Sequence, residues 1–182
     1  KKGSDAILKT RKYVKDKDFA VLLPDDLILG RNCLKELIGV YKKKKSSVVG
    51  VMKVLAKDVE KYGIVKGDIS DSRTMRISEL IEKPKVKSAP SNLAVVGRYI
   101  LKNSIFKYLA KTPKGTGNEV QLTDAISLSA QKEKVFSHRF LGKRYDCGSK
   151  LGFLKAQLAC ALNDPIMKKS IKKEIEYILS KV

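Results

Sequence analysis

Residues 19–27 read Phe-Ala-Val-Leu-Leu-Pro-Asp-Asp-Leu, and this stretch decides the fold class. Its first five residues are continuously apolar, which is typical of a short strand buried on both faces. Pro24 ends the strand, and two carboxylates, Asp25 and Asp26, follow at once. Open α/β sheets bind ligands at the carboxyl ends of their strands, so the stretch predicts both a sheet and a site.

Helical and strand-like patterns alternate after this strand. Residues 31–45 carry an apolar stripe at helical spacing, and residues 47–55 form a second apolar run. Strand, helix and strand in this order form a βαβ unit, which implies a partly parallel sheet. Further strands are expected over 62–65, 75–82, 93–101 and 135–140, helices over 104–109, 119–131, 151–162 and 166–179, and a loop at 115–117. The chain is therefore predicted to be mixed α/β.

The composition allows one domain with a real core. The chain has 182 residues, 43% of them hydrophobic, and no apolar run approaches the length that spans a membrane. Its three cysteines, Cys33, Cys147 and Cys160, are an odd number without C-x-x-C spacing. Neither a disulfide framework nor a zinc site is favoured, and a reducing cytoplasm is the simplest compartment.

A net charge of +20 raises the question of nucleic-acid binding, because clustered cations release counterions from phosphates. Only seven of the 39 basic residues are arginine, and no aromatic residues are interleaved with the lysines as stacking platforms. The densest lysine run, residues 42–45, follows a helical pattern and suits the negative end of a helix dipole. A solvated basic surface is favoured, and a nucleic-acid-binding protein is the alternative.

A second acidic corner lies in Tyr145-Asp146-Cys147-Gly148-Ser149, between an expected strand and an expected helix. Asp146 could complete a two-carboxylate site with Asp25, because Mg²⁺ takes one or two protein carboxylates plus substrate phosphates. The alternatives are an aspartate-rich turn at Asp25-Asp26 and a helix cap at Asp146 or Ser149.

Cys147 is a potential nucleophile in the same corner. A cysteine nucleophile needs a base beside it, and the sole histidine, His138, lies in a strand-like segment with no obvious acidic partner. A small packed cysteine and a surface or structural histidine are favoured.

Glu82-Lys83-Pro84 ends another expected strand. A carboxylate can accept hydrogen bonds from sugar hydroxyls, and the adjacent ammonium can hold a phosphate as a point charge. A Glu-Lys pair is common on protein surfaces, so these three residues alone are a weak signal.

These segments together resemble the bacterial UTP–glucose-1-phosphate uridylyltransferases. The resemblance extends from about Ala6 to about Leu179 and is carried, in order, by residues 19–27, 62–65, 81–84, 92–101, 119–126 and 144–156. Gln-Leu-Thr-Asp-Ala-Ile at 121–126 and Asp-Cys-Gly-Ser-Lys at 146–150 are specific to this branch, because the related thymidylyltransferases carry different versions.

The resemblance implies a Rossmann-like nucleotidyltransferase fold with a central mixed sheet, in one domain over 1–182 that is incomplete at its N-terminus. It implies that Asp25 and Asp146 are the Mg²⁺ ligands, and that Asp25 and Lys83 serve catalysis, with Lys83 holding the sugar phosphate.

The resemblance also implies a sugar pocket. Glu82 takes the glucose hydroxyls, and the backbones of Gly63 and Val95 shape the pocket, with Asp26 and Tyr99 nearby. Gly63 has a physical rationale, because a residue without a Cβ lets the backbone approach a ligand closely. For Val95 and Tyr99 the alternative is core packing.

The implied reaction forms UDP-glucose and pyrophosphate from UTP and glucose 1-phosphate. The expected partners are these three molecules, with no nucleic acid and no membrane, and the protein is expected to be a cytoplasmic homo-oligomer. The family's glycine-rich N-terminal signature, which holds the nucleotide phosphates, finds no match, so the chain alone is expected to be inactive. The alternatives are a dTDP- or ADP-glucose-forming enzyme and a non-catalytic subunit that binds sugar phosphates or forms oligomers.

Overall fold

The computed structural model describes residues 3–115, 118 and 120–181, and they separate into two compact units. Unit 1 comprises Lys1–Leu22 and Cys33–Leu141, and unit 2 comprises Leu23–Asn32 and Gly142–Val182. Each unit is described by itself. The single domain expected over 1–182 stays a prediction.

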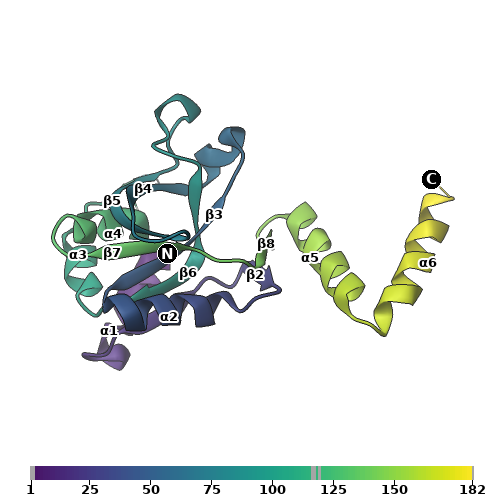
Figure 1. Cartoon of the computed structure of the whole chain (residues 1–182), viewed down its shortest axis with the longest axis horizontal. Coiled ribbons are helices and arrows are strands. Elements are labelled where there is room, and N and C mark those ends of the chain that lie inside the picture. The colour runs from purple at the N-terminus through teal and green to yellow at the C-terminus, as the bar shows by residue number, and fades with distance from the viewer. Residues whose placement is uncertain (1–2, 116–117, 119, 182) are drawn as a thin grey trace. The chain divides into compact units, whose positions relative to one another are not determined.

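A six-stranded mixed sheet forms the centre of unit 1 (Figure 1). The only parallel pair among the described strands is β3 with β7, and β4 also pairs with β6. This arrangement confirms the predicted mixed α/β class with a central mixed sheet. In spatial order the strands are β1 (Phe19–Leu22), β6 (Leu93–Leu101), β3 (Ser47–Lys53), β7 (Val135–Arg139), β5 (Thr74–Glu82) and β4 (Gly63–Ile69).

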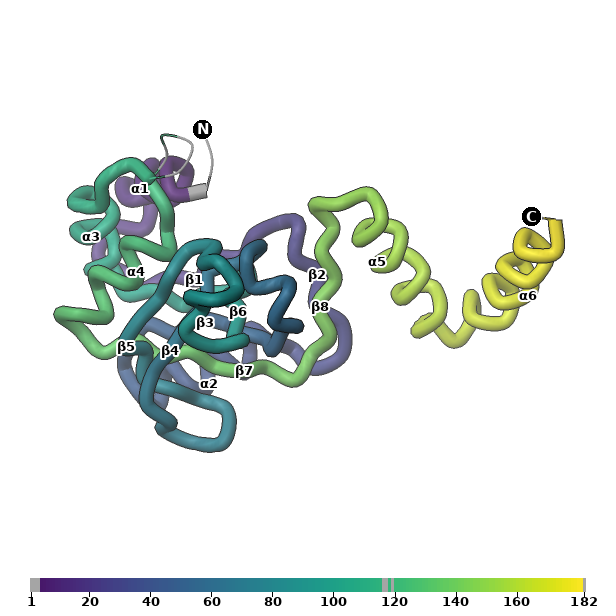
Figure 2. The backbone as a smooth tube through the Cα atoms, turned by 90° about the horizontal axis from the view of Figure 1, so that it is seen from above, coloured from purple at the N-terminus to yellow at the C-terminus, as the bar shows by residue number. Residues whose placement is uncertain are grey.

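Four helices pack around this sheet. Helix α2 (Cys33–Lys44) contacts β3 and β6, and α4 (Leu122–Ala130) contacts β5 and β7. Helix α3 (Ile105–Lys111) packs on α4, and α1 (Gly3–Val14) packs on α3, so these three are grouped together (Figure 2). Two 3₁₀ turns, η1 (Ala56–Lys61) and η2 (Val86–Ser88), contact each other.

The interior of unit 1 is mainly apolar and is formed by side chains of both the sheet and the helices. The first five residues of β3, Ser47–Val51, are all buried, as expected for an inner strand that packs on both faces. Helices contribute large side chains that are almost completely buried, including Leu37, Phe106, Leu109 and Ile126. Burial of this kind is the main source of folding free energy.

The structure corrects one expectation about residues 19–23. Strand β1 ends at Leu22, and its residues alternate between half-buried and exposed instead of being buried on both faces. Among the described residues β1 pairs with β6 alone, which places it at an edge of the sheet. Leu22 is accordingly 50% exposed.

The predicted βαβ unit is present, but a later strand separates its two strands. β6 lies between β1 and β3 and is antiparallel to both, so β1 and β3 run in the same direction without pairing. Helix α1 and two short strands of unit 2 were not predicted. Two predictions lie in part outside the described residues. They are the loop at 115–117 and the helix at 119–131, whose first residue is not described.

Unit 2 consists of a two-stranded ribbon and two helices. Strands β2 (Asp26–Leu29) and β8 (Lys143–Asp146) are antiparallel, and α5 (Lys150–Asn163) and α6 (Met167–Leu179) follow. Ser149 caps α5, because its Oγ accepts a hydrogen bond from the backbone N of Gly152 at 3.1 Å. No helix in the described part of the chain combines the length and apolarity that crossing a membrane requires.

Candidate active site

The first group of predicted site residues lies where β4 begins and β5 ends, in unit 1. Gly63 and Glu82 are register partners in this antiparallel pair. Lys83 follows Glu82, and its Nζ lies 3.9 Å from Glu82 Oε1. The Lys83 side chain is 62% exposed and that of Glu82 is 23% exposed. An exposed cation and a half-buried carboxylate therefore lie side by side at the end of this strand pair.

Lys83 adopts an uncommon backbone conformation, with a φ of +47°. Lys15 and Lys45 also have positive φ, but they directly follow α1 and α2, where a left-handed residue commonly ends a helix. Lys83 ends a strand and precedes Pro84, which restricts the preceding residue to extended conformations. Strain of this kind is concentrated at functional sites, which makes Lys83 a strong site candidate.

The backbone of Lys83 is held in this conformation by the neighbouring strand. Its N–H donates a 3.0 Å hydrogen bond to the carbonyl of Tyr62, the residue before Gly63. Position 63 has no room for a side chain, because a Cβ there would lie 2.7 Å from Thr123 Cγ2 and 3.1 Å from Glu82 Oε2. The local packing thus requires glycine at this position.

Val95 and Tyr99 lie on β6, which pairs with β4 near Gly63. Ile64 is the register partner of Ala94, so Gly63 and Val95 flank that pair. Val95 is 7% exposed and Tyr99 is 5% exposed. Both side chains belong to the core, and their proposed part in the sugar pocket stays a prediction.

The second group of predicted site residues lies on the ribbon of unit 2. Asp26 and Asp146 are register partners, and the backbone N of Cys147 donates to the carbonyl of Asp25 at 2.7 Å. A Cβ on Gly148 would lie 3.2 Å from both Asp25 Oδ2 and Asp146 Oδ1, so these oxygens are no farther apart than twice that distance. The structure therefore brings two carboxylates together that are distant in sequence.

Asp26 has a different environment from Asp25. It is 5% exposed and forms an ion pair with Arg144, whereas the Asp25 side chain is exposed. Arg144 Nη2 also lies 3.9 Å from Asp146 Oδ1, which accepts a 3.1 Å hydrogen bond from the backbone N of Gly148. Arg144 thus links the buried carboxylate to the half-buried one. The sugar-pocket role of Asp26 stays a prediction.

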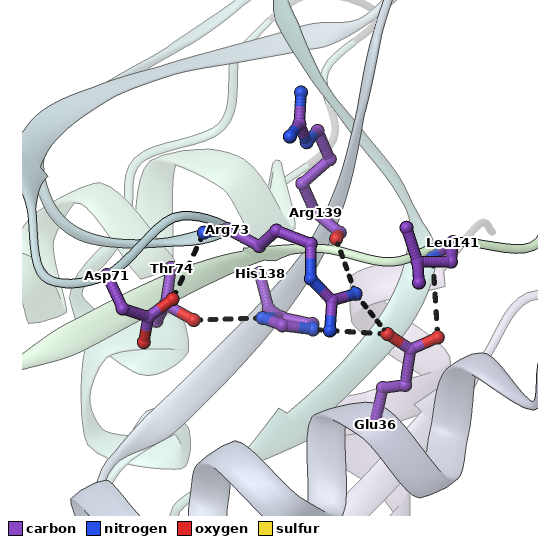
Figure 3. Close-up of polar contacts among 7 residues, drawn as sticks. All are labelled: Glu36, Asp71, Arg73, Thr74, His138, Arg139 and Leu141. Atoms are coloured by element: carbon purple, nitrogen blue, oxygen red, sulfur yellow. Dashed lines mark hydrogen bonds and ion pairs between the residues drawn. The ribbon is translucent and has the colours of Figure 1, made fainter.

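His138 is a structural residue of unit 1, as the sequence analysis favours (Figure 3). Its ring is buried, with Nδ1 2.9 Å from Thr74 Oγ1 and Nε2 3.5 Å from Glu36 Oε2. Glu36 also accepts a 2.5 Å hydrogen bond from Arg73 and a 3.3 Å bond from the backbone N of Leu141.

This network sets the protonation of two groups. Burial lowers the pKa of His138, although the hydrogen bond to Glu36 opposes that shift. Burial acts to raise the pKa of Glu36, but the hydrogen bonds from Arg73, Leu141 and His138 outweigh it and hold that pKa below its ordinary value. Both ring nitrogens of His138 thus interact with neighbouring side chains of unit 1.

Burial excludes Cys33 as an activated nucleophile. All three cysteines are free, and burial raises the pKa of the Cys33 thiol to about 12, which keeps it protonated. The interpretation of Cys147 as a small packed cysteine stays a prediction.

Arg144 and Thr123 are two residues of interest that the sequence patterns alone did not single out. Arg144 lies two positions before Asp146, and this alternation within a short strand was the available signal for an ion pair on one face. Thr123 lies inside the 121–126 segment, but contact with Gly63 depends on how α4 packs, which sequence spacing alone does not reveal.

The nucleotidyl transferase family matches residues 2–162 of this chain. A UTP–glucose-1-phosphate uridylyltransferase of Staphylococcus epidermidis is 40% identical over 174 residues, which cover 95% of this chain and 60% of that protein. The chain thus spans about 60% of the length of the relatives it matches.

Solved structures agree with this match. The UTP-bound UGPase of Acinetobacter baumannii has a TM-score of 0.85 and 38% identity, with 94% of this chain and 60% of that chain covered. A UDP-glucose pyrophosphorylase complexed with UDP-glucose has a TM-score of 0.83 and 39% identity, with 86% of this chain and 60% of that chain covered.

Proposed function

Because this chain belongs to the nucleotidyl transferase family, we propose that it acts in the transfer of a uridylyl group from UTP to glucose 1-phosphate. The products are UDP-glucose and pyrophosphate. The observation that carries the proposal is the 40% identity, over 95% of this chain, with an enzyme named for that reaction. The UTP and UDP-glucose complexes of similar structures support the choice of nucleotide and sugar.

The chemistry needs no nucleophile from the protein. A phosphate oxygen of glucose 1-phosphate attacks the α-phosphorus of UTP in line, the bond to the β-phosphate breaks, and pyrophosphate leaves with the electron pair. The attacking oxygen is already anionic, so no general base is required. The protein must hold two anions together and align them, which is the main requirement in phosphoryl transfer.

The first group of residues suits the sugar side. The exposed ammonium of Lys83 would hold the phosphate of glucose 1-phosphate, and its constrained backbone limits the positions that the ammonium can take. Glu82 would accept hydrogen bonds from sugar hydroxyls, because an ionised carboxylate is an acceptor only. Gly63 would shape the pocket through its backbone, because the absence of a Cβ leaves room for the Thr123 methyl group and for Glu82 Oε2.

The second group fits a hard divalent cation. Nucleotidyl transferases of this kind generally use a divalent metal. Asp25 and Asp146 place carboxylate oxygens close together, and no cluster of three or more ligating side chains occurs within the described ranges. Asp25 and Asp146 would therefore hold Mg²⁺ with phosphate oxygens completing its coordination. When bound, Mg²⁺ neutralises the phosphate charge that develops during transfer.

Two further features of the proposal concern the protein as a whole. We propose that it is a cytoplasmic homo-oligomer. Free cysteines suit a reducing compartment, and α5 exposes Leu151, Phe153 and Leu154, which a partner surface would cover. Molar mass measured in solution by light scattering tests the oligomer, and a monomer at all concentrations would refute it.

The activity is tested by pyrophosphate release from UTP and glucose 1-phosphate. Two proteins are compared: this chain alone, and a chimera in which the part of the S. epidermidis relative that this chain does not match is joined to it. We expect the chimera to release pyrophosphate and the chain alone to release none that is measurable. The unmatched part would supply charge-assisted hydrogen bonds to the triphosphate, each worth about 1.5–3 kcal/mol.

A chimera that is as active with dTTP as with UTP would contradict the uridylyl assignment, and a chimera that releases no pyrophosphate would refute the proposed function. Equal and measurable rates from the chain and the chimera would contradict the expectation that this chain alone is inactive.

A further inference from the structure

Thr123 carries the one buried side-chain polar atom without a hydrogen-bond partner in the described part of the chain. The residue lies in the first turn of α4 and is 7% exposed. A hydroxyl buried without a partner destabilises the fold, and native structures contain few of them. This hydroxyl therefore needs an explanation.

The surroundings of Thr123 point to the sugar side of the proposed site. A Cβ on Gly63 would lie 2.7 Å from the Thr123 methyl carbon and 3.1 Å from Glu82 Oε2. The methyl group and the carboxylate oxygen thus flank the same point above the Gly63 backbone. The hydroxyl has no partner, while its methyl group faces the same point above Gly63 as the Glu82 carboxylate.

A rotation about χ1 can bring the hydroxyl to the position that the methyl group fills here, while the methyl group moves to the third position on Cβ. Threonine in a helix divides between two χ1 rotamers, unlike valine and isoleucine, which strongly prefer one. In the second rotamer the hydroxyl can move toward the space that the methyl group fills here, beside Glu82. A hydrogen bond from a hydroxyl to a carboxylate is one of the stronger kinds.

We propose that Thr123 is a positioning residue of the sugar site, whose hydroxyl donates to the Glu82 carboxylate when a hexose phosphate binds. This hydrogen bond fixes the orientation of Glu82 and leaves its other lone pairs for the sugar hydroxyls. The inference rests on the proposed function, because it assigns Glu82 to the sugar. Thr123 itself does not touch the reacting atoms.

Two substitutions separate the hydroxyl of Thr123 from its methyl group. Thr123→Val keeps the shape and removes the donor, and Thr123→Ser keeps the donor and removes the methyl. Thr112→Val is the matched control, because Thr112 is equally buried at 7% but its hydroxyl donates to the Tyr108 carbonyl at 2.8 Å. All three are made in the chimera, with glucose 1-phosphate as the titrated ligand.

For Thr123→Val we expect glucose 1-phosphate to bind about tenfold more weakly and its KM to rise equally. The KM for UTP should not change. The Tm should not fall, because the substitution removes a buried hydroxyl that has no hydrogen-bond partner. Thr123→Ser should keep the KM near the unsubstituted value despite a lower Tm. Thr112→Val should lower the Tm and leave both KM values unchanged.

The outcomes distinguish this proposal from the proposed function. If the unsubstituted chimera does not bind glucose 1-phosphate, the proposed function fails and this inference fails with it. If that chimera binds glucose 1-phosphate and Thr123→Val binds it equally well, only the role of Thr123 is refuted. A KM rise of the same size in Thr123→Ser would also refute it, because the hydroxyl is retained there.

Discussion

Unit 1 and unit 2 differ in the kind and number of side chains that they bury. Unit 1 buries a large set of apolar side chains on both strands and helices, whereas the described residues of unit 2 bury only Ala156 and the charged Asp26. Helix α5 is apolar on most of its surface but leaves Leu151 62% exposed and Phe153 51% exposed. Apolar burial therefore stabilises unit 1, while unit 2 depends on ribbon hydrogen bonds and one buried ion pair.

The same division separates the two kinds of proposed site chemistry. The candidate sugar-side residues lie in the unit with the apolar core, where β4 begins and β5 ends. The candidate metal carboxylates lie in the unit that is held by polar contacts. Each group of residues can therefore be substituted within its own unit.

The largest expected effect comes from the buried ion pair of unit 2. Arg144→Met removes an ion-pair partner of the buried Asp26 carboxylate, and breaking such a pair from one side costs about 3–5 kcal/mol. Faster hydrogen exchange of the β2 and β8 amides, with unchanged exchange in β3, would show that the loss is confined to unit 2. Exchange restored in the double variant Asp26→Leu/Arg144→Met would identify the unpaired charge as the cause.

The next effect tests the apolar core of unit 1. Leu37 is completely buried on α2, so Leu37→Ala should lower the free energy of unfolding by about 2–5 kcal/mol in urea titrations. Leu154→Ala removes the same atoms from a side chain that is 51% exposed. Its expected effect is within about 0.5 kcal/mol. Equal losses in the two variants would contradict the contrast between the units.

A third effect separates the chemistry of the two units. Lys83→Ala should reduce kcat/KM for glucose 1-phosphate about a hundredfold in the chimera, because it removes the ammonium that is proposed to hold the sugar phosphate. Binding of Mn²⁺, measured by its electron paramagnetic resonance, should not change. Asp146→Asn should weaken Mn²⁺ binding and leave glucose 1-phosphate binding intact. Loss of both ligands in either variant would show that the two groups are not separable.

The smallest effect is a pH dependence confined to unit 1. Burial holds the pKa of His138 below 6.5, so the unfolded chain binds the proton more readily than the folded chain. The stability from this residue is complete above pH 6.5 and is lost as the pH falls through the folded pKa. The charges around the ring are Glu36, Arg73 and Asp71.

The chain has no second histidine, so unit 2 should show no such slope in this window. Urea midpoints between pH 5 and 7, followed by exchange of β7 and β8 amides, measure the difference. A slope that persists in His138→Gln would refute its assignment to this residue.

Local pattern predicted most of the longer elements of both units. Strands β3 and β6 are long apolar runs, and α3, α5 and α6 have clear helical spacing, so each was expected within a few residues. Local pattern did not predict the strand order. β6 separates β1 from β3, and this pairing joins segments that are far apart in the sequence. Short strands such as β2 and β8 exist only through each other, and no local pattern encodes them.

The candidate site shows the same limit. The residue types at Asp25, Lys83 and Asp146 suggested their chemistry, and the resemblance suggested their roles. The convergence of Asp25 with Asp146 and the contact of Thr123 with Gly63 arise from tertiary packing. The burial of Asp26 against Arg144 likewise required the ribbon.

The order of the strands also has a consequence for synthesis on the ribosome. β1 and β3 can pair with β6 only after Leu101 has emerged, and β2 must wait for β8, which ends at Asp146. At a translation rate of about 5–20 residues per second, the nascent chain exposes these unpaired strands for several seconds. Asp25 and Asp146 thus meet late, after every strand of unit 1 has been translated.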